Sequence, residues 1–305
     1  MTPTFTPAAD VFAGWQSDLL SGKPPTLYPI AEPGNPLAHV EIGPGLVTMF
    51  GGSPGAGKTA LVMQLVVDAL RLTPTLKTLV ANVEMPAAAL LDRQMSGLSG
   101  IDLHTIRHRK LSSEHAERVA VGMNTLAEFV PRLGFARPPY SLDNIARSAD
   151  VFGADVLVLD YVQRIAPPGE HAHRKAAIDA VMEYVRGFAD AGVAVIVVAA
   201  VGRQRDENGR SGYAGLNLAS FRESSELEYG ADDAFLLVRD NADDAGAVTL
   251  KHAKSRYGEP LDVALRFSGC VQRFDPADDP DDGQLAGAVR DVWGRHATGA
   301  EGGEW

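Results

Sequence analysis

The chain alternates between short apolar runs and longer segments in which apolar positions recur at helical spacing. The apolar runs lie at residues 46–50, 78–83, 156–159, 193–201, 234–238 and 247–250. The segments with helical spacing lie at residues 59–72, 87–98, 113–129, 141–152 and 174–191. The first four apolar runs are nearly continuous, as expected for parallel strands that helices cover on both faces. This pattern predicts an α/β fold with a mostly parallel, twisted sheet.

The last two apolar runs predict a different arrangement. They follow one another closely, and the segment Gly258-Glu259-Pro260 comes after them. Glycine and proline favour a turn at such a position. We therefore expect these two runs to form an antiparallel extension at one edge of the sheet.

The two ends of the chain fall outside this alternation. Residues 9–20 carry apolar side chains at helical spacing, and a short helix there can pack on its own core or on a neighbouring subunit. Residues 275–305 contain eight acidic and two basic residues, a net charge of −6. Such a run is typical of a solvated end, and a docking tail is the alternative. We divide the chain into an N-terminal extension with a candidate linker helix (1–40), a core domain (41–275) and an acidic C-terminal tail (276–305).

The composition limits the classes of protein to which the chain can belong. With 305 residues, 45% of them hydrophobic, it can bury one large core. Since there is no run of 18 apolar residues and no signal-peptide pattern, we expect a cytoplasmic protein without membrane contact. The single cysteine, Cys270, excludes a disulfide framework within one chain, and its apolar neighbours predict packing in a strand. The net charge of −11 does not favour DNA binding, although a ring with a basic pore can be acidic outside.

A phosphate-binding loop is the most specific signal in the sequence. The first apolar run leads into Gly52-Ser53-Pro54-Gly55-Ala56-Gly57-Lys58-Thr59, which has the spacing of a P-loop between a strand and a helix. Glycines let backbone N–H groups turn towards the β- and γ-phosphates, at the positive end of the helix dipole. Lys58 is expected to bind the phosphates, and the Thr59 hydroxyl to hold Mg²⁺. The chain is therefore predicted to bind a nucleoside triphosphate.

Two carboxylates follow strands of the same predicted sheet. Asp160 ends the third apolar run, at the position where a P-loop ATPase holds Mg²⁺ beside the loop threonine. Glu84 follows the second run, and a carboxylate at that edge of a parallel sheet can polarise the attacking water. The alternative for Glu84 is an exposed side chain that opens a helix, with Pro86 in its first turn. The local sequence leaves both interpretations open.

Two cations follow the last apolar run. Lys254 and Arg256 are two residues apart, so on a strand they project to the same face. In P-loop ATPases that form rings, such cations often serve the active site of the next subunit. A solvated edge strand is the alternative.

Taken in order, these motifs resemble those of the C-terminal, RecA-type motor domain of the replicative DNA helicase DnaB. The resemblance covers roughly three-quarters of the chain, from residue 40 to residue 275. Besides the P-loop, it is carried by Glu228 and by residues 83–86 (Val-Glu-Met-Pro), 101–107 (Ile-Asp-Leu-His-Thr-Ile-Arg), 159–163 (Leu-Asp-Tyr-Val-Gln), 221–224 (Phe-Arg-Glu-Ser) and 254–258 (Lys-Ser-Arg-Tyr-Gly). The Asp-Tyr-x-Gln and Arg-Glu-Ser pieces are distinctive for this family among P-loop proteins. The resemblance implies a RecA-like P-loop NTPase core.

The resemblance also implies a role for each matched residue. Glu84 looks like the catalytic base that activates water, Asp160 like the Walker B aspartate, and Gln163 like the glutamine that links nucleotide state to the DNA loops. Lys254 and Arg256 look like the pair that reaches into a neighbouring subunit, with Arg256 as the arginine finger. ATP as the nucleotide, and a hexameric ring around single-stranded DNA, follow from the same resemblance.

For DNA contacts, the resemblance points to residues 203–225, a long polar connection after a buried strand. Arg222 and Glu223 match positions in the family's DNA-contacting loop, and Arg203 and Arg205 lie at the start of the segment. Such a loop can follow a nucleic-acid backbone with N–H groups and one arginine per subunit, without reading sequence.

The sequence departs from the family pattern in three places. The family's N-terminal helical domain, which meets primase, has no counterpart, and the first 40 residues supply at most a linker helix. Gly202 stands where the family has a glutamine, so nucleotide sensing is expected to be weakened or passed to Gln204. Ser225 stands where the pore loop usually has glycine, which alters how closely the backbone approaches DNA.

Three functions remain open at the level of sequence. The motifs favour an ATP-hydrolysing, DnaB-like motor that forms a ring, translocates on single-stranded DNA as a helicase, and serves a phage, plasmid or mobile element. The second is a RecA- or clock-type ATPase switch that controls assembly with a replication or recombination protein. The acidic balance, the missing N-terminal domain and Gly202 favour this switch. The third is a scaffold that binds nucleotide without turnover, and the residues that argue against it are Lys58, Thr59, Glu84 and Asp160.

Overall fold

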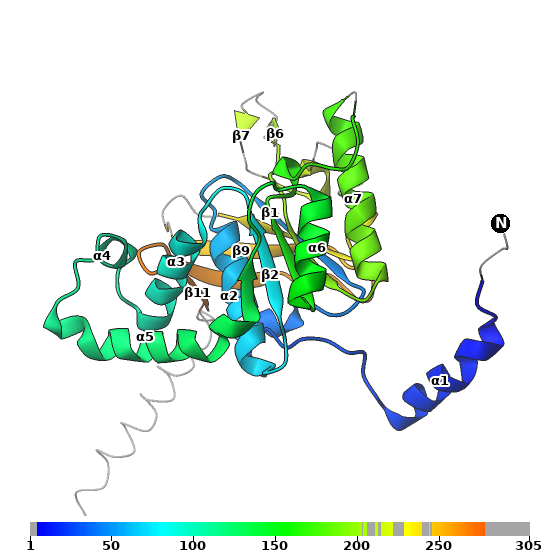
Figure 1. The fold of residues 1–305 in the computed structure, drawn as a ribbon, viewed down its shortest axis with the longest axis horizontal. Helices are drawn as coiled ribbons and strands as arrows, with labels where there is room; N and C mark the ends of the chain where they lie inside the picture. The colour runs from blue at the N-terminus through cyan, green and yellow to red at the C-terminus, as the bar shows by residue number, and fades with distance from the viewer. Residues whose placement is uncertain are drawn as a thin grey trace, which may run out of the picture.

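A mixed sheet lies at the centre of the molecule (Figure 1). The computed structural model describes residues 5–171, 173–202, 204–205, 211–212, 215–221, 229–239, 244 and 246–277, with the backbone alone at 204–205 and 211–212. Within these residues the sheet has nine strands in the order β11-β10-β9-β8-β1-β5-β4-β2-β3. Their bounds are β1 Val47–Gly52, β2 Thr78–Asn82, β3 Leu133–Phe135, β4 Val156–Asp160, β5 Ala194–Val198, β8 Asp233–Val238, β9 Ala247–Lys254, β10 Val263–Ser268 and β11 Arg273–Pro276. A separate short ribbon consists of β6 (Gln204–Arg205) and β7 (Ser211–Gly212).

The sheet has a parallel part and an antiparallel edge. Among the described strands, β8, β1, β5, β4, β2 and β3 run parallel to one another. Beyond β8, the strands β9, β10 and β11 run antiparallel. The predicted fold class is confirmed, but the antiparallel edge begins one strand later than the sequence indicated. The reason is that β8 pairs in parallel with β1 on one side and in antiparallel with β9 on the other.

The sequence analysis did not predict three strands of the nine-stranded sheet, because their local signals are weak. β3 has only three residues and β11 only four, while β10 alternates buried positions such as Val263 and Leu265 with exposed ones. The prediction that Cys270 packs in a strand was wrong. Cys270 is exposed in the turn between β10 and β11. Of its apolar neighbours, Phe267 belongs to β10 and Val271 lies in the same turn.

Helices cover both faces of the sheet (Figure 1). On one face α2 (Lys58–Leu72) packs together with α3 (Ala87–Ser99) and α5 (Ala116–Phe129), and on the other lie α6 (Leu142–Phe152) and α7 (Arg174–Asp190). Successive strand residues point to opposite faces, so Met49 joins the core under α6 and α7 and Phe50 joins the core under α2. This two-sided burial explains why the central runs are apolar throughout. The shorter elements are α4 Leu103–Arg107, η1 Pro36–His39, η2 Ser113–His115, η3 Val130–Arg132, η4 Val162–Arg164 and η5 Leu218–Ser220.

Helix α1 (Ala8–Ser21) stands apart from the sheet (Figure 1). All of its residues are exposed, including the large apolar side chains of Val11, Phe12, Trp15 and Leu19. The segment is helical as expected, but it does not pack on the chain's own core. Of the two packing partners considered from sequence, the neighbouring subunit stays a prediction.

The ends of the chain add two observations. The acidic tail lies outside the described residues except for Pro276 and Ala277. In the part of the chain that the structure describes, none of the helices combines the length and the hydropathy that a membrane crossing needs.

Candidate functional site

The glycine-rich loop joins the carboxyl end of β1 to the first turn of α2. Gly57 has a φ of 98°, and a Cβ at this position would lie 2.8 Å from the ring of Phe274, so only glycine fits. Lys58 Nζ donates hydrogen bonds to the carbonyl oxygens of Gly52 and Ser53, at 2.8 and 3.1 Å. The loop therefore curls around the Lys58 ammonium group, beside the free N–H groups at the start of α2.

A buried carboxylate lies beside this loop. Asp160 ends β4 and is 5% exposed, and its Oδ2 accepts hydrogen bonds from Thr59 Oγ1 and Asn82 Nδ2, both at 2.7 Å. Burial raises the pKa of Asp160 and the charge of Glu84 adds to this, whereas the hydrogen bond from Thr59 and the charge of Lys58 lower it. A hydroxyl and a carboxylate side by side form a donor set that suits a hard cation such as Mg²⁺.

Glu84 follows β2 at the same edge of the sheet. Asn82 Oδ1 accepts hydrogen bonds from the backbone N–H groups of Glu84 and Met85, at 3.0 and 2.7 Å, and this fixes the turn out of β2. The same Asn82 side chain reaches Asp160, so one amide couples the two segments that carry carboxylates. Burial lowers the pKa of Lys58, and the charges of Asp160 and Glu84 oppose this shift. The Glu84 side chain is exposed, yet it lines the same space as Lys58.

These side chains converge on one cavity of about 430 Å³. A cavity of this size suits a small-molecule ligand. Of the residues expected from sequence, Lys58, Thr59, Glu84 and Asp160 come together in it with much of the P-loop. Its lining residues are Pro54, Gly55, Gly57, Lys58, Thr59, Glu84, Met85, Arg93, Asp160, Tyr161, Ala200, Phe267 and Gln272.

Sequence reasoning missed Arg93 and Gln272. Arg93 lies on α3, where burial lowers its pKa, with Arg107 acting in the same direction and Asp160 against it. Arginines are common on partly exposed helices, so nothing in the sequence around Arg93 indicated that it would line the cavity. Gln272 lies in the turn between β10 and β11, two strands that the sequence pattern did not reveal.

Gln163 lies next to the cavity rather than in its wall. It belongs to η4, directly after β4 and Tyr161. Its side-chain amide forms two hydrogen bonds with the backbone of Ala200, one to the carbonyl oxygen and one from the N–H, both at 3.0 Å. Since Ala200 lines the cavity and follows β5, Gln163 joins the ends of two central strands beside the P-loop.

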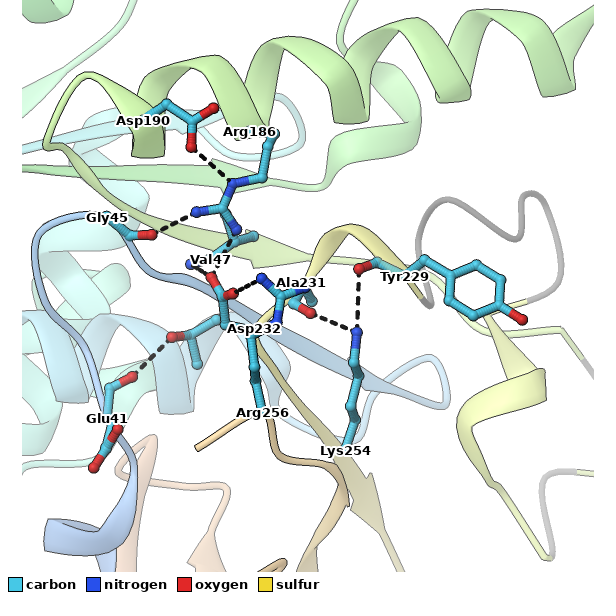
Figure 2. A network of polar contacts seen from close by, with 11 residues as sticks. Glu41, Gly45, Val47, Arg186, Asp190, Tyr229, Ala231, Asp232, Lys254 and Arg256 are labelled. Carbon is cyan, nitrogen blue, oxygen red and sulfur yellow. Dashed lines mark hydrogen bonds and ion pairs between the residues drawn. The ribbon is translucent and has the colours of Figure 1, made fainter. Parts of the chain in front are cut away.

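Lys254 and Arg256 lie near the amino ends of β1 and β8, whereas the cavity lies at the carboxyl ends of the parallel strands. Figure 2 shows the contacts of both cations. Lys254 Nζ donates to the carbonyl oxygens of Ala231 and Tyr229, at 2.6 and 3.2 Å. Arg256 Nη1 lies 2.6 Å from Asp232 Oδ1. All three partners precede β8, close to the amino end of β1, whereas the P-loop follows the carboxyl end. The six residues of β1 span about 17 Å, so neither cation reaches the cavity of its own chain.

The residues expected to contact DNA lie largely outside the described part of the chain. Of Arg205 only the backbone is described, in β6. Gly202, which stands where a glutamine is expected, donates its N–H to the carbonyl oxygen of Ser220 at 2.8 Å. The positions outside the described residues are Arg203, Arg222, Glu223 and Ser225.

Comparison with known proteins gives one consistent family. A family model described as "DnaB-like helicase C terminal domain" matches residues 42–276. The chain is 26% identical over 244 residues to a protein named "Replicative DNA helicase DnaB" from Buchnera aphidicola subsp. Schizaphis graminum, covering 76% of this chain and 51% of that protein. A protein of the same name from Pasteurella multocida is 28% identical over 234 residues, with 73% and 49% covered. A "Probable plasmid replicative DNA helicase" from Chlamydia trachomatis is 24% identical over 227 residues, with 72% and 48% covered.

The chain spans about half the length of the curated relatives it matches. Among solved structures, one described as an ATPase domain matches with a TM-score of 0.76 at 18% identity, over 90% of this chain and 100% of that chain. The structure described as "The Structure Of A DnaB-Like Replicative Helicase And Its Interactions With Primase" matches with a TM-score of 0.75 at 18% identity, over 90% of this chain and 68% of that chain. This likeness confirms the expected RecA-like core.

Proposed function

Because this chain belongs to the DnaB-like helicase C-terminal domain family, we propose that it hydrolyses ATP and drives a ring along single-stranded DNA. The observation that carries the proposal is the convergence of Lys58, Thr59, Glu84 and Asp160 on one cavity. This cavity lies at the carboxyl edge of the parallel strands, which is where open α/β sheets bind their ligands.

In this proposal the P-loop holds the phosphates of ATP. Lys58 exchanges its hydrogen bonds to the loop carbonyls for bonds to β- and γ-phosphate oxygens. Thr59 Oγ1 and Asp160 Oδ2, which lie 2.7 Å apart, supply oxygen ligands for Mg²⁺. When bound, Mg²⁺ neutralises negative charge on the phosphate oxygens.

Glu84 is the proposed general base. Its carboxylate lines the cavity beside Lys58 and accepts a proton from the water that attacks the γ-phosphorus, and ADP leaves. Gln163 holds the backbone at Ala200, just before the segment that is proposed to contact DNA. This contact gives a physical route from the nucleotide to residues 203–225.

Lys254 and Arg256 are assigned to the nucleotide site of a neighbouring copy. Their position at the far end of β1 from their own P-loop supports this assignment. The exposed apolar side chains of α1 supply a docking element between copies, and a hexamer is the proposed assembly.

Single-stranded DNA is the proposed track, contacted in the pore by Arg203, Arg205, Arg222 and Glu223. Phosphate contacts by arginine make binding weaker as salt rises. A plasmid, phage or mobile-element setting is proposed with this function, and the relative named as a plasmid helicase supports it.

Steady-state ATP hydrolysis with and without single-stranded DNA tests the proposal. We expect DNA to stimulate hydrolysis several-fold at low salt and less at moderate salt, because counterion release weakens binding. Lys58→Ala should abolish the activity under both conditions. Hydrolysis that is lost in Lys58→Ala but indifferent to DNA would contradict the motor.

The net charge of −11 and Gly202 favour a second candidate, an ATPase switch that assembles with a replication or recombination protein. A switch predicts slow hydrolysis that DNA leaves unchanged and a protein partner accelerates. The same assay therefore separates the two candidates.

A further inference from the structure

The buried carboxylate of Asp232 contacts two arginines, Arg186 and Arg256, near the amino ends of β1 and β8 (Figure 2). Asp232 is 1% exposed, and its Oδ2 accepts hydrogen bonds from the Val47 N–H and from Arg186 Nη1, both at 2.8 Å. Its Oδ1 lies 2.6 Å from Arg256 Nη1, as an ion pair that lacks hydrogen-bond alignment. Asp232 is therefore fixed on one side by the protein core and faces Arg256 on the other.

Arg186 is the partner of this carboxylate on the side of the core. It also donates to the Gly45 carbonyl oxygen at 2.5 Å and to Asp190 Oδ1 at 3.3 Å. Burial works against the charge of Arg186, but the contacts with Asp232 and Asp190 outweigh it and raise its pKa. Arg186 and the Val47 N–H thus compensate the charge of Asp232 from the side of the core.

Arg256 is held differently, because 44% of its side chain is exposed. Its Nη1 contacts the buried carboxylate, and within the described residues the guanidinium has no further ion pair. Lys254 is tied to the carbonyl oxygens of Ala231 and Tyr229, so the same short segment places both cations. The guanidinium at the tip of this long side chain is thus held at one nitrogen while the side chain stays partly exposed.

We propose that Asp232 is the positioning residue for Arg256 in its action on a neighbouring nucleotide site. The proposal rests on the proposed function, in which Arg256 acts between copies. By restricting the rotamers of Arg256 beforehand, Asp232 lowers the entropy that is lost when the guanidinium meets the phosphate. Val47, which anchors Asp232, is the first residue of the strand that leads into the P-loop, so one strand supports both halves of the site.

ATP hydrolysis by Asp232→Asn tests this role, with Arg256→Ala as the benchmark and Asp190→Asn as the matched control. Asp190 contacts Arg186 but not Arg256, and 71% of its side chain is exposed. We expect Arg256→Ala to lower kcat about 1,000-fold, the lower end of the range for an arginine finger. Asp232→Asn should lower kcat about tenfold with the KM for ATP within about twofold, because the finger is present but misplaced. Asp190→Asn should match the parent.

Two further measurements separate positioning from a general structural defect. In the double variant, Asp232→Asn should cause no loss beyond that of Arg256→Ala, since it acts through that residue. Subunits with Asp232→Asn should also regain activity when mixed with Lys58→Ala subunits, which have an intact finger. If Asp232→Asn does not fold, Asp232→Glu keeps the charge but shifts the carboxylate by one methylene, and it should show the same split between kcat and KM.

Each contrary result points to a different error. Parent-like kcat in Arg256→Ala would overturn the role of Arg256 itself and this proposal with it. A large loss in Arg256→Ala with parent-like kcat in Asp232→Asn and Asp232→Glu would overturn the positioning role alone. Additive losses in the double variant, or no recovery on mixing, would show that Asp232 serves only the fold.

Discussion

At the residue scale, Asp160 and Glu84 are both carboxylates beside the P-loop, but their surroundings differ. Asp160 is buried and accepts two hydrogen bonds, which hold its carboxylate in place. Glu84 is exposed to the cavity, and within the described residues the hydrogen bond that holds it is the one from its backbone N–H to Asn82. A carboxylate that is free to contact water suits a base better than a metal ligand. The sequence places both residues at the edge of the sheet. That one carboxylate is buried and the other exposed is known only from the structure.

Glu84→Gln is expected to lower kcat for ATP hydrolysis by at least about 100-fold, because an amide cannot accept the proton of the attacking water. The dissociation constant for ATP, measured by fluorescence with a labelled nucleotide, should stay within about threefold of the parent, since Lys58 and Thr59 are intact. Glu128→Gln, at an exposed position on α5, is the matched control. Hydrolysis by Glu84→Gln at the parent rate would show that another group is the base.

Asp68 predicts a pH dependence of stability. Burial raises its pKa to about 6, although Arg71 and Arg273 oppose the shift. Between about pH 4 and pH 6 the folded protein keeps a proton that the unfolded chain has lost, so the free energy of unfolding falls as pH rises through this window. Asp68→Asn removes this effect. Because 30% of the side chain is exposed, we expect a gain of only about 1 kcal/mol at pH 7.5.

Urea unfolding of the parent and Asp68→Asn at several pH values measures this gain. The two curves should converge towards pH 4, where the folded parent carries the proton. A constant difference at all pH values would mean that packing, rather than the charge of Asp68, sets the stability.

At the element scale, residues of the antiparallel edge form part of the cavity wall, although they lie far from the P-loop in the sequence. The side chain of Gln64 on α2 forms two hydrogen bonds with the backbone of Phe274 on β11, at 2.8 and 2.9 Å. Phe274 also packs against Gly57, and Gln272 then reaches the cavity wall. Helix α2 was predicted almost to the residue, because its apolar periodicity is local. β11 was not, because its place depends on Gln64, which is 210 positions away.

Substitutions on helix α1 are expected to weaken the assembly of copies and to leave the stability of the core unchanged. The aromatic rings of Phe12 and Trp15 lie 5.7 Å apart on a helix with no buried residue. If they dock on a second copy, Phe12→Ser with Trp15→Ser should raise the concentration at half-assembly at least about tenfold, since each lost aromatic burial is worth about 2 kcal/mol. Light scattering measures the mass, with Gln16→Ser as the control, and thermal unfolding should stay unchanged. An unchanged assembly would rule out α1 as the docking element.

At the scale of the whole molecule, the two halves of the proposed shared site lie at opposite ends of the same strand. Lys58 lies at the carboxyl end of β1, and the Asp232 that holds Arg256 lies at its amino end. In the proposed function, Arg256 therefore serves another copy. Closed rings satisfy such a head-to-tail arrangement, because each subunit then gives and receives one finger.

Mixing subunits tests this arrangement. Lys58→Ala and Arg256→Ala should each be nearly inactive alone, but a mixture of the two should regain part of the parent activity. At some interfaces an intact P-loop of the Arg256→Ala subunit then meets an intact finger of the Lys58→Ala subunit. ATP hydrolysis across a series of mixing ratios should pass through a maximum. No recovery at any ratio would contradict a shared site.

The sequence by itself determined the succession of central strands and helices along the chain. It also determined the P-loop and the two carboxylates, Glu84 after β2 and Asp160 at the end of β4. These features depend on periodicity and on residues that are neighbours along the chain. Only the tertiary structure decided that Arg93 and Gln272 join the cavity, that β8 pairs with β1, and that Asp232 holds Arg256. Such contacts join segments far apart in the sequence. Local hydrophobic pattern carries no information about them, because they form only when the sheet brings its strand ends together.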